Sequence, residues 1–400
     1  GGVDMAKPGF VPSEVREILE SHFDLHVLHV QGLPSYDDQN WRVEARDGRV
    51  YVVKAAASGA DCRGLADAST TLEQLELEAQ AMQLLQEAGV TCPVPIPALR
   101  GDCRSSGAHT VRVDKENGGD GVNFFRVVSF LPGVVLAKVP HSPALLQDLG
   151  AVIAQAQNAM ASLEAPAHLQ RAWALENAPA VRQHFEALSS PLVESVAPMP
   201  VDEQRAMSEY WLAQFEALDT AAMSRQVLHS DVNDYNVLVD DEAAGESPQS
   251  LAYIGVIDFG DMVHTCRVFD LAIALAYVCQ NKPSRGAALE AACQVLFGYS
   301  SIIELSSVER KALPVCVAAR LVQSVVSSAH AITVEPENRE YLAVNAAPGW
   351  ALLSQWTDIE KSQEGFTALQ ARAHPPPSAV TLGASGGSSL VGENELRKTA

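Results

Sequence analysis

Basic side chains are scarce in this chain. Its 400 residues include 28 Lys and Arg against 49 Asp and Glu, so the formal net charge at pH 7 is −21. A protein of this charge is repelled by nucleic-acid phosphates and by anionic lipid headgroups. We therefore expect neither nucleic acid nor a membrane among its partners, whereas a cationic small molecule suits the charge balance.

The chain also lacks the cysteine spacing of a zinc or redox site. Its cysteines number seven, and neighbouring ones lie at least eleven residues apart. The first residues contain no basic segment followed by an apolar run, and the apolar run at 271–279 is too short to span a bilayer. These absences predict reduced thiols, no secretory signal and a cytoplasmic location.

Apolar residues are not scarce. They make up 47% of the chain and charged residues 19%, which is enough for a sizeable core. The length fits two or three domains, or one enzyme with two lobes. The segment 371–400 contains P-P-P and G-A-S-G-G-S-S, and it predicts a low-complexity tail or a linker.

Two polar motifs follow each other in the middle of the chain. H-S-D-V-N-D-Y-N places His229, Asp231 and Asn236 in the spacing H-x-D-x-x-x-x-N, and D-F-G begins at Asp258. Phosphoryl transfer needs a carboxylate that accepts the proton of the attacking hydroxyl, and oxygen ligands that hold Mg²⁺ against the nucleotide phosphates. Asp and Asn also occur in turns for conformational reasons alone. The order of the motifs, joined by a predicted strand, turn and strand, favours Asp231 as the proton acceptor and Asn236 and Asp258 as Mg²⁺ ligands.

The preceding part of the chain predicts a small antiparallel sheet. Strands are expected at 25–30, 41–45 and 51–55, and Lys54 follows an apolar run, as the phosphate-pairing lysine of a kinase does. Taken alone, Lys54 would be an exposed strand lysine, but the motifs downstream favour the catalytic interpretation.

A turn at 34–40 occupies the place of a nucleotide-covering loop. It contains no glycine, so its backbone cannot approach phosphates as closely as a glycine-rich loop does. The side chains of Ser35 and Asn40, or backbone N–H groups of the turn, are then the candidates for phosphate contacts.

A long helix is predicted at 70–88, ended by Gly89. On its inner face Glu78 is expected to pair with Lys54 and to fix the ammonium for the phosphates, in preference to Glu76. Further strands at 111–113 and 123–130 complete the sheet, and L-P-G after them predicts the hinge between two lobes, with the nucleotide base beneath it.

From residue 142 onward the pattern is helical. Asp270 lies in a very apolar helix, where it either caps the helix or accepts hydrogen bonds from the backbone of the catalytic loop. Arg320 interrupts another apolar helix, so it is either paired or lines the substrate cleft. Further helices are expected at 143–163, 178–188, 202–218, 268–279, 285–298, 307–329 and 337–362.

With these motifs the chain resembles the aminoglycoside phosphotransferase and choline kinase superfamily, and within it the hydroxylysine kinases. The resemblance covers residues 12–360. It implies an α+β, protein-kinase-like bilobal fold, with an N-lobe at 1–130, a C-lobe at 131–370 and the tail at 371–400. The segments that carry it are L-P-S-Y-D-D-Q-N, V-V-K, S-F-L-P-G, H-S-D-V-N-D-Y-N, I-D-F-G-D-M, V-F-D-L-A-I and R-E-Y-L-A-V-N-A-A-P-G-W.

The resemblance also implies an activity. It points to a kinase that prefers GTP to ATP, uses Mg²⁺ and phosphorylates the 5-hydroxyl of 5-hydroxy-L-lysine. The family's proton acceptor falls on Asp231, its metal ligands on Asn236 and Asp258, and its phosphate lysine and the partner of that lysine on Lys54 and Glu78. The chain departs from the family pattern in having Ser230 where Gly is usual and Trp41 where Phe is usual.

Other interpretations stay open at this stage. Asp261 either binds an amine of the substrate or caps a loop, and Arg267 and Arg320 are the candidates for the substrate carboxylate. The acceptor is alternatively another hydroxylated small molecule, such as homoserine, choline or an aminoglycoside. A further alternative is a non-catalytic nucleotide-binding module of a larger fused protein.

Overall fold

The computed structural model describes most of the chain. The described residues are 8–33, 35, 38–58, 68–99, 108–114, 122–164, 171–194, 199–240 and 254–362. The predicted tail at 371–400 lies outside them, as do residues 115–121 and 241–245 of two loops expected between strands.

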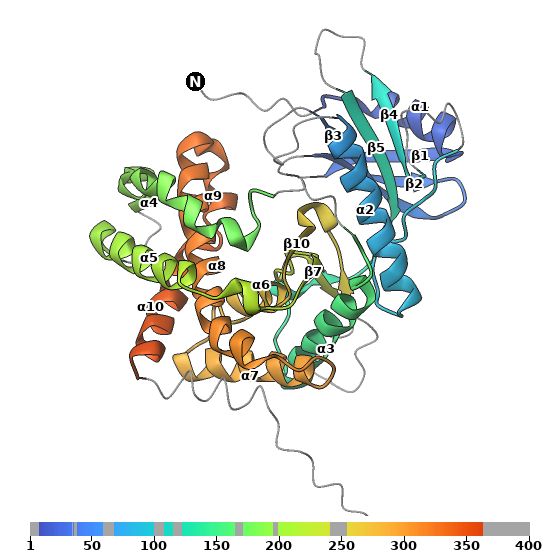
Figure 1. The fold of residues 1–400 in the computed structure, drawn as a ribbon. Helices are drawn as coiled ribbons and strands as arrows, with labels where there is room; N and C mark the ends of the chain where they lie inside the picture. The colour runs from blue at the N-terminus through green and yellow to red at the C-terminus, as the bar shows by residue number, and fades with distance from the viewer. Residues whose placement is uncertain are drawn as a thin grey trace, which may run out of the picture.

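An antiparallel sheet with the strand order β1-β2-β3-β5-β4 forms the upper part of the molecule (Figure 1). Strands β2 and β3 largely alternate buried and partly exposed residues, and Gly48 has the left-handed φ of +80° that the turn between them requires. The strands are β1 (Val27–Leu33), β2 (Gln39–Ala45), β3 (Val50–Ala57), β4 (Thr110–Asp114) and β5 (Val122–Ser129).

The two faces of this sheet are covered by different helices. Helix α1 (Pro12–His22) packs Val15 and Leu19 against Trp41 and Val53 on one face. Helix α2 (Ala68–Glu87) packs on the other face, as Figure 1 also shows. Residues directly opposite each other on neighbouring strands share a face. Asn40, Lys54 and Arg126 are opposite one another on β2, β3 and β5, so they lie in a row on the α2 side.

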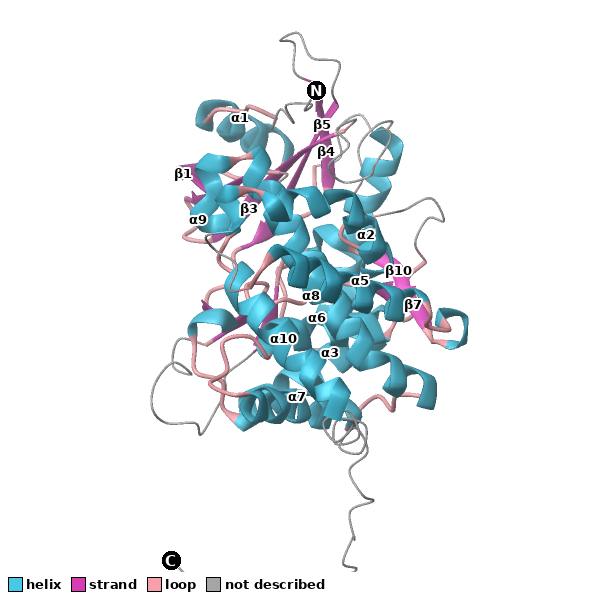
Figure 2. Ribbon diagram, turned by 90° about the vertical axis from the view of Figure 1, so that its left-hand side faces the viewer, coloured by secondary structure: helices cyan, strands magenta, loops and turns pink. Residues whose placement is uncertain are grey.

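The remainder of the described chain is mainly helical (Figure 2), which agrees with the predicted α+β class. The helices, with η for 3-10 helices, are η2 (Leu136–Lys138), α3 (Pro143–Met160), η3 (Leu175–Ser189), α4 (Pro191–Glu194), α5 (Val201–Glu216), η4 (Thr220–Ala222), η6 (Phe259–Asp261), α6 (Val268–Val278), α7 (Arg285–Ser300), α8 (Ser307–Val334), η7 (Pro336–Asn338), α9 (Arg339–Leu342) and α10 (Ala346–Ser362).

Two helix predictions were wrong in part. The segment expected to be a helix at 178–188 is the 3-10 helix η3, which contains Pro179. The helix expected at 337–362 is broken between α9 and α10. Pro348 explains the break, because a proline is tolerated in the first turn of α10 but would clash with a carbonyl inside a continuous helix.

Two small sheets frame the loop that carries the first motif. Strand β7 (Arg225–Leu228) pairs with β10 (Val263–Cys266), and β8 (Val237–Val239) pairs with β6 (Val134–Val135) and β9 (Ile254–Val256). The motif residues 229–236 connect β7 to β8, and the D-F-G motif follows β9. The D-F-G segment connects β9 to β10, so each motif joins one strand of the β7–β10 pair to one strand of the β8–β9 pair.

The helices behind these strands form the largest buried cluster. Every residue of α6 is buried. Helix α8 is long and apolar enough to cross a membrane by length and composition, but 83% of its apolar window is buried inside the protein, so it is a core helix. Helices α3 and α7 pack closely at Gly150 and Gly298, where an added Cβ would overlap the backbone carbonyls of Val295 and Gln147.

Five cysteines lie in the described part of the chain, namely Cys92, Cys266, Cys279, Cys293 and Cys316, and all five are buried and unbridged. Burial raises the pKa of the Cys92 and Cys279 thiols to about 12. Thiols in this state are poor nucleophiles, so these two cysteines serve as apolar packing residues.

Candidate active site

His229 fastens the first motif to the second. Its ring is buried, its Nδ1 accepts a hydrogen bond from the backbone N–H of Asp231 at 3.2 Å, and its Nε2 lies 3.0 Å from the carbonyl oxygen of Ile257. The neutral ring with its hydrogen on Nε2 satisfies both contacts, and burial lowers the pKa of His229. The ring of His229 therefore links the two motifs through hydrogen bonds and has a structural role.

Asp270 on helix α6 holds the same loop through hydrogen bonds to its backbone. Its Oδ1 accepts from the backbone N–H of Ser230 at 2.8 Å and its Oδ2 from that of His229 at 3.3 Å, so the hydrogen-bonding interpretation is confirmed. Burial raises the pKa of Asp270 to about 7. Ser230 has a φ of +65°, a left-handed conformation that glycine adopts readily, which accounts for the usual Gly at this place in the family it resembles.

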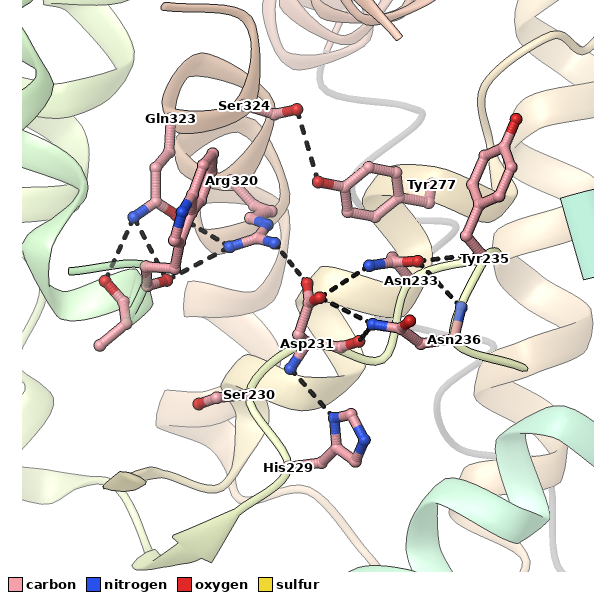
Figure 3. Close-up of polar contacts among 12 residues, drawn as sticks. His229, Ser230, Asp231, Asn233, Tyr235, Asn236, Tyr277, Arg320, Gln323 and Ser324 are labelled. Atoms are coloured by element: carbon pink, nitrogen blue, oxygen red, sulfur yellow. Dashed lines mark hydrogen bonds and ion pairs between the residues drawn. The ribbon is translucent and has the colours of Figure 1, made fainter. Parts of the chain in front are cut away.

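Asp231 projects from this loop, and Figure 3 shows three donors around its carboxylate. Its Oδ2 accepts from the side-chain amides of Asn233 at 2.8 Å and Asn236 at 2.7 Å. Its Oδ1 accepts from the guanidinium of Arg320 at 2.7 Å. Each carboxylate oxygen has two lone pairs. Counting donors from the described residues, both lone pairs of Oδ2 are occupied and one position for a further donor is left on Oδ1.

Asn236 and Asp258 are held at neighbouring positions. The carbonyl oxygen of Asn236 accepts from the backbone N–H of Ile257, the residue before Asp258, at 2.9 Å. The Nδ2 of Asn236 donates to two oxygens of Asp231, at 2.7 and 3.0 Å. Its Oδ1, the atom that a metal ion would bind, points away from these contacts.

Lys54 reaches Asp258 across the space between the sheet and the helical part. Its Nζ donates to Oδ1 of Asp258 at 2.7 Å. The charge of Lys54 holds the pKa of Asp258 well below its usual range, so this carboxylate is ionised at neutral pH. The structure thus brings three of the predicted residues, Lys54, Asp231 and Asp258, to one region, with His229 beside both carboxylates.

The predicted ion pair between Lys54 and Glu78 was wrong. Glu78 is 1% exposed and pairs with Arg126, and the guanidinium of Arg171 lies 4.0 Å from it. Arg126 is opposite Lys54 on the neighbouring strand and is itself 7% exposed. A fully buried carboxylate is best matched by a buried planar guanidinium with several donors, which explains why Arg126 takes this position.

Arg126 also contacts the turn between β1 and β2. Its guanidinium lies 3.3 Å from the carboxylate of Asp38. Ser35 donates its hydroxyl hydrogen to the carbonyl oxygen of Asp38 within the same turn. Asn40 is opposite Lys54 in the register, and its buried Oδ1 has no hydrogen-bond partner in the described part of the chain. Three residues of the predicted turn, Pro34, Tyr36 and Asp37, lie outside the described residues.

Asp261 places a further carboxylate beside Asp231. The pKa of Asp261 is raised to about 7, first by burial and then by the negative charge of Asp231, while the cations Arg171 and Arg320 act in the opposite direction. A carboxyl group in this environment is expected to bind an ammonium group, because a bound cation would stabilise its charged form.

The residues present fit a magnesium site that a nucleotide completes. Within the described ranges, no group of three or more His, Cys, Asp or Glu side chains is placed to hold a metal ion. Mg²⁺ in nucleotide sites commonly takes only one or two carboxylates from the protein, with phosphate and water oxygens as its other ligands. The carboxylate of Asp258 and the amide oxygen of Asn236 match that requirement.

Sequence reasoning missed Asp38, Arg126 and Arg171, and it left the partner of Arg320 open. Arg126 is a charged residue in the otherwise apolar strand F-F-R-V-V, which was the available signal for a buried ion pair. Arg320 stood out in the same way in helix α8.

Comparison of the sequence with known proteins shows the family to which the chain belongs. A model of the phosphotransferase enzyme family matches residues 29–305. A hydroxylysine kinase of Mus musculus is 30% identical over 373 residues, which cover 88% of this chain and 91% of that protein. A hydroxylysine kinase of Danio rerio is 27% identical over 366 residues, which cover 90% of this chain and 94% of that protein.

Solved structures support the fold. An amicoumacin kinase in complex with AMP-PNP and Ca²⁺ superposes with a TM-score of 0.59 at 14% identity, over 89% of this chain and 95% of that one. A microcompartment-associated aminopropanol kinase also gives 0.59, at 18% identity over 89% of this chain and 99% of the other. These likenesses establish the kinase-like bilobal architecture.

Proposed function

The chain belongs to the phosphotransferase enzyme family and is an enzyme that phosphorylates a hydroxyl group, and on that premise we propose a donor and an acceptor for it. The donor is GTP and the acceptor is the 5-hydroxyl of 5-hydroxy-L-lysine, which gives 5-phosphohydroxy-L-lysine and GDP. The identity to hydroxylysine kinases along nearly the whole chain supports this acceptor. The observation that carries the proposal is the carboxylate of Asp231, whose Oδ1 retains one position for a donor.

In this proposal Asp231 is the proton acceptor. The hydroxyl of the acceptor donates to Oδ1 of Asp231, which orients the hydroxyl oxygen toward the γ-phosphate. The amides of Asn233 and Asn236 keep the carboxylate from rotating. As the new O–P bond forms and the bond to GDP breaks, the hydroxyl proton passes to Asp231.

Lys54, Asn236 and Asp258 form the phosphate side of the site. With a nucleotide bound, the ammonium of Lys54 would donate to phosphate oxygens, and Asp258 and Asn236 would hold Mg²⁺. The ion, when bound, neutralises charge that builds on the phosphates during transfer.

Further parts of the proposal concern the nucleotide turn and the acceptor. The side chains of Ser35 and Asn40 contact the phosphates, with the side-chain amide of Asn40, beside Lys54, donating through its N–H groups. Ser35 makes this contact when its hydroxyl turns from the carbonyl oxygen of Asp38, to which it donates in this structure. Glu78 positions the nucleotide side of the site through Arg126. Asp261 binds an ammonium group of the acceptor.

The proposal includes the lobe boundaries, with the N-lobe at 1–130, the hinge at 131–133 and the C-lobe at 131–370. It also includes a cytoplasmic location. The buried, unbridged cysteines of the described residues support a reducing compartment.

A coupled GDP-release assay tests the function. The assay compares 5-hydroxy-L-lysine with L-lysine, which lacks the accepting oxygen, and offers GTP and ATP in parallel. We expect turnover with 5-hydroxylysine, none with lysine, and higher kcat/KM with GTP. Turnover with homoserine, choline or an aminoglycoside instead would identify a different acceptor. Nucleotide-dependent thermal stabilisation without transfer to any of them would indicate a non-catalytic module.

A further inference from the structure

Arg320 is held in one position on helix α8 by two aromatic rings and two carbonyl-type acceptors. Its side chain is 3% exposed, and its guanidinium carbon lies 5.3 Å from the ring centre of Trp173 and 5.6 Å from that of Tyr277. One terminal nitrogen donates to the carbonyl oxygen of Trp173 at 3.3 Å and to Oε1 of Gln323 at 3.2 Å. Figure 3 shows the guanidinium lying between Gln323 and Asp231.

The opposite edge of this guanidinium faces Asp231, and only one of its two nitrogens makes a hydrogen bond. The other terminal nitrogen donates to Oδ1 of Asp231 at 2.7 Å, while the buried Nε has no hydrogen-bond partner in the described part of the chain. The Nε and the adjacent terminal nitrogen of an arginine form a fork that matches the two oxygens of a carboxylate. A buried donor without an acceptor is unfavourable, so this edge is suited to a ligand oxygen.

A substrate hydroxyl bound at Asp231 brings the other polar groups of the substrate close to the Nε edge of Arg320. The one available lone pair of Asp231 is on Oδ1, the oxygen that Arg320 also contacts. A hydroxyl bound there therefore lies beside the guanidinium. In 5-hydroxylysine, three carbon–carbon bonds separate the hydroxyl-bearing carbon from the α-carbon, so the α-carboxylate is within reach of the Nε edge.

We propose that Arg320 binds the carboxylate of the acceptor and so selects amino acids over simple amino alcohols. The inference rests on the proposed function and adds the residue that recognises the carboxylate of the substrate. Arg320 then bridges two carboxylates, one of the substrate and one of Asp231, which fixes the hydroxyl at the proton acceptor. Arg267 also has a buried Nε without a hydrogen-bond partner in the described part of the chain, but its guanidinium lies 3.6 Å from Glu309, whereas that of Arg320 contacts the proton acceptor Asp231.

Three acceptors that differ only at the acid group test the proposal. They are 5-hydroxylysine, its carboxamide, and 1,5-diamino-2-hydroxypentane, which lacks the carboxyl group. We expect the wild-type enzyme to prefer the acid by about 10- to 100-fold in kcat/KM, the range of a charged hydrogen-bonded contact. In Arg320→Gln this preference is expected to disappear, and in Arg320→Lys to be reduced but retained.

Arg310→Gln is the matched control, because it removes a partly buried arginine from the same helix ten residues away. It is expected to keep the wild-type preference. Calorimetric binding of the three acceptors in the presence of GDP gives the same comparison for variants that lose turnover.

The outcomes separate the inference from the function on which it rests. A wild-type enzyme that phosphorylates 5-hydroxylysine but treats all three acceptors alike would overturn the role of Arg320 without any variant. A folded Arg320→Gln protein that keeps the preference would overturn it as well. A wild-type enzyme that binds and phosphorylates none of the three would contradict the proposed function itself.

Discussion

Replacing Arg126 with methionine tests the buried ion pair between Arg126 and Glu78, which the structure has in place of the expected pair between Lys54 and Glu78. Arg126 is 7% exposed and contacts two buried carboxylates, those of Glu78 and Asp38, so the substitution removes from both the cation that they share. Removing one partner of a buried pair costs about 3–5 kcal/mol of unfolding free energy. The guanidinium of Arg171, 4.0 Å from Glu78, retains part of the compensation. We therefore expect a loss of about 3 kcal/mol, at the lower end of that range.

Urea unfolding at neutral pH measures this loss, and a second variant tests its cause. If the charge left on Glu78 is responsible, Arg126→Met combined with Glu78→Leu recovers part of the lost stability, because an apolar pair of similar volume often replaces a buried ion pair without loss. Recovery is partial because Asp38 still lacks its contact with Arg126. Arg42→Met is the matched control, since Arg42 lies on β2 of the same sheet and pairs with the partly exposed Glu44. It is expected to change stability little.

Two results would refute the reasoning. One is an Arg126→Met protein that unfolds at the same urea concentration as the wild type. The other is a double variant that is no more stable than the single one, which would mean that packing of the arginine, and not the charge left on Glu78, determines the loss.

Three further predictions concern the catalytic loop and the acceptor site. Asp231→Asn is expected to lower kcat by about 10²- to 10⁴-fold with nucleotide affinity near wild type, as measured by steady-state kinetics and calorimetry, and retained turnover would contradict its role. The pKa of Asp261 is raised to about 7, so its carboxyl is mostly protonated below that pH and mostly charged above it. The kcat/KM for the acceptor should therefore fall by up to about tenfold per pH unit below pH 7, and Asp261→Asn should remove this dependence. Ser230→Gly should leave thermal stability unchanged or raise the unfolding free energy by up to about 1 kcal/mol, because glycine adopts the left-handed backbone without strain, and a clear loss would show that the serine hydroxyl matters.

The parts of the site that the sequence predicted correctly are local. The spacing of His229, Asp231 and Asn236 predicted a loop between two strands, and the apolar run before Lys54 predicted the strand that carries it. Patterns of this kind depend on residues within one element. They therefore indicated which side chains share a face and which loops carry polar groups.

The contacts that the sequence did not predict are long-range. Helical periodicity put Glu78 on the inner face of α2, but it contained no information on whether Lys54 or the neighbouring Arg126 reaches it. The contact between Arg320 and Asp231 joins residues 89 apart in the chain. Each partner was visible as a charged residue in an apolar setting, whereas the pairing depends on how strands and helices pack in three dimensions.

The crossing of α3 and α7 restricts how this enzyme can be re-engineered. Helix α3 carries Gln157, whose amide donates to the carbonyl oxygen of Arg267 at 3.0 Å and accepts from the hydroxyl of Tyr299 on α7 at 2.6 Å. At Gly150 and Gly298 the two backbones already touch, so neither helix can shift without separating both. Variants with altered acceptor preference should therefore be sought among side chains such as Trp173 and Tyr277, and library design can leave this helix crossing untouched.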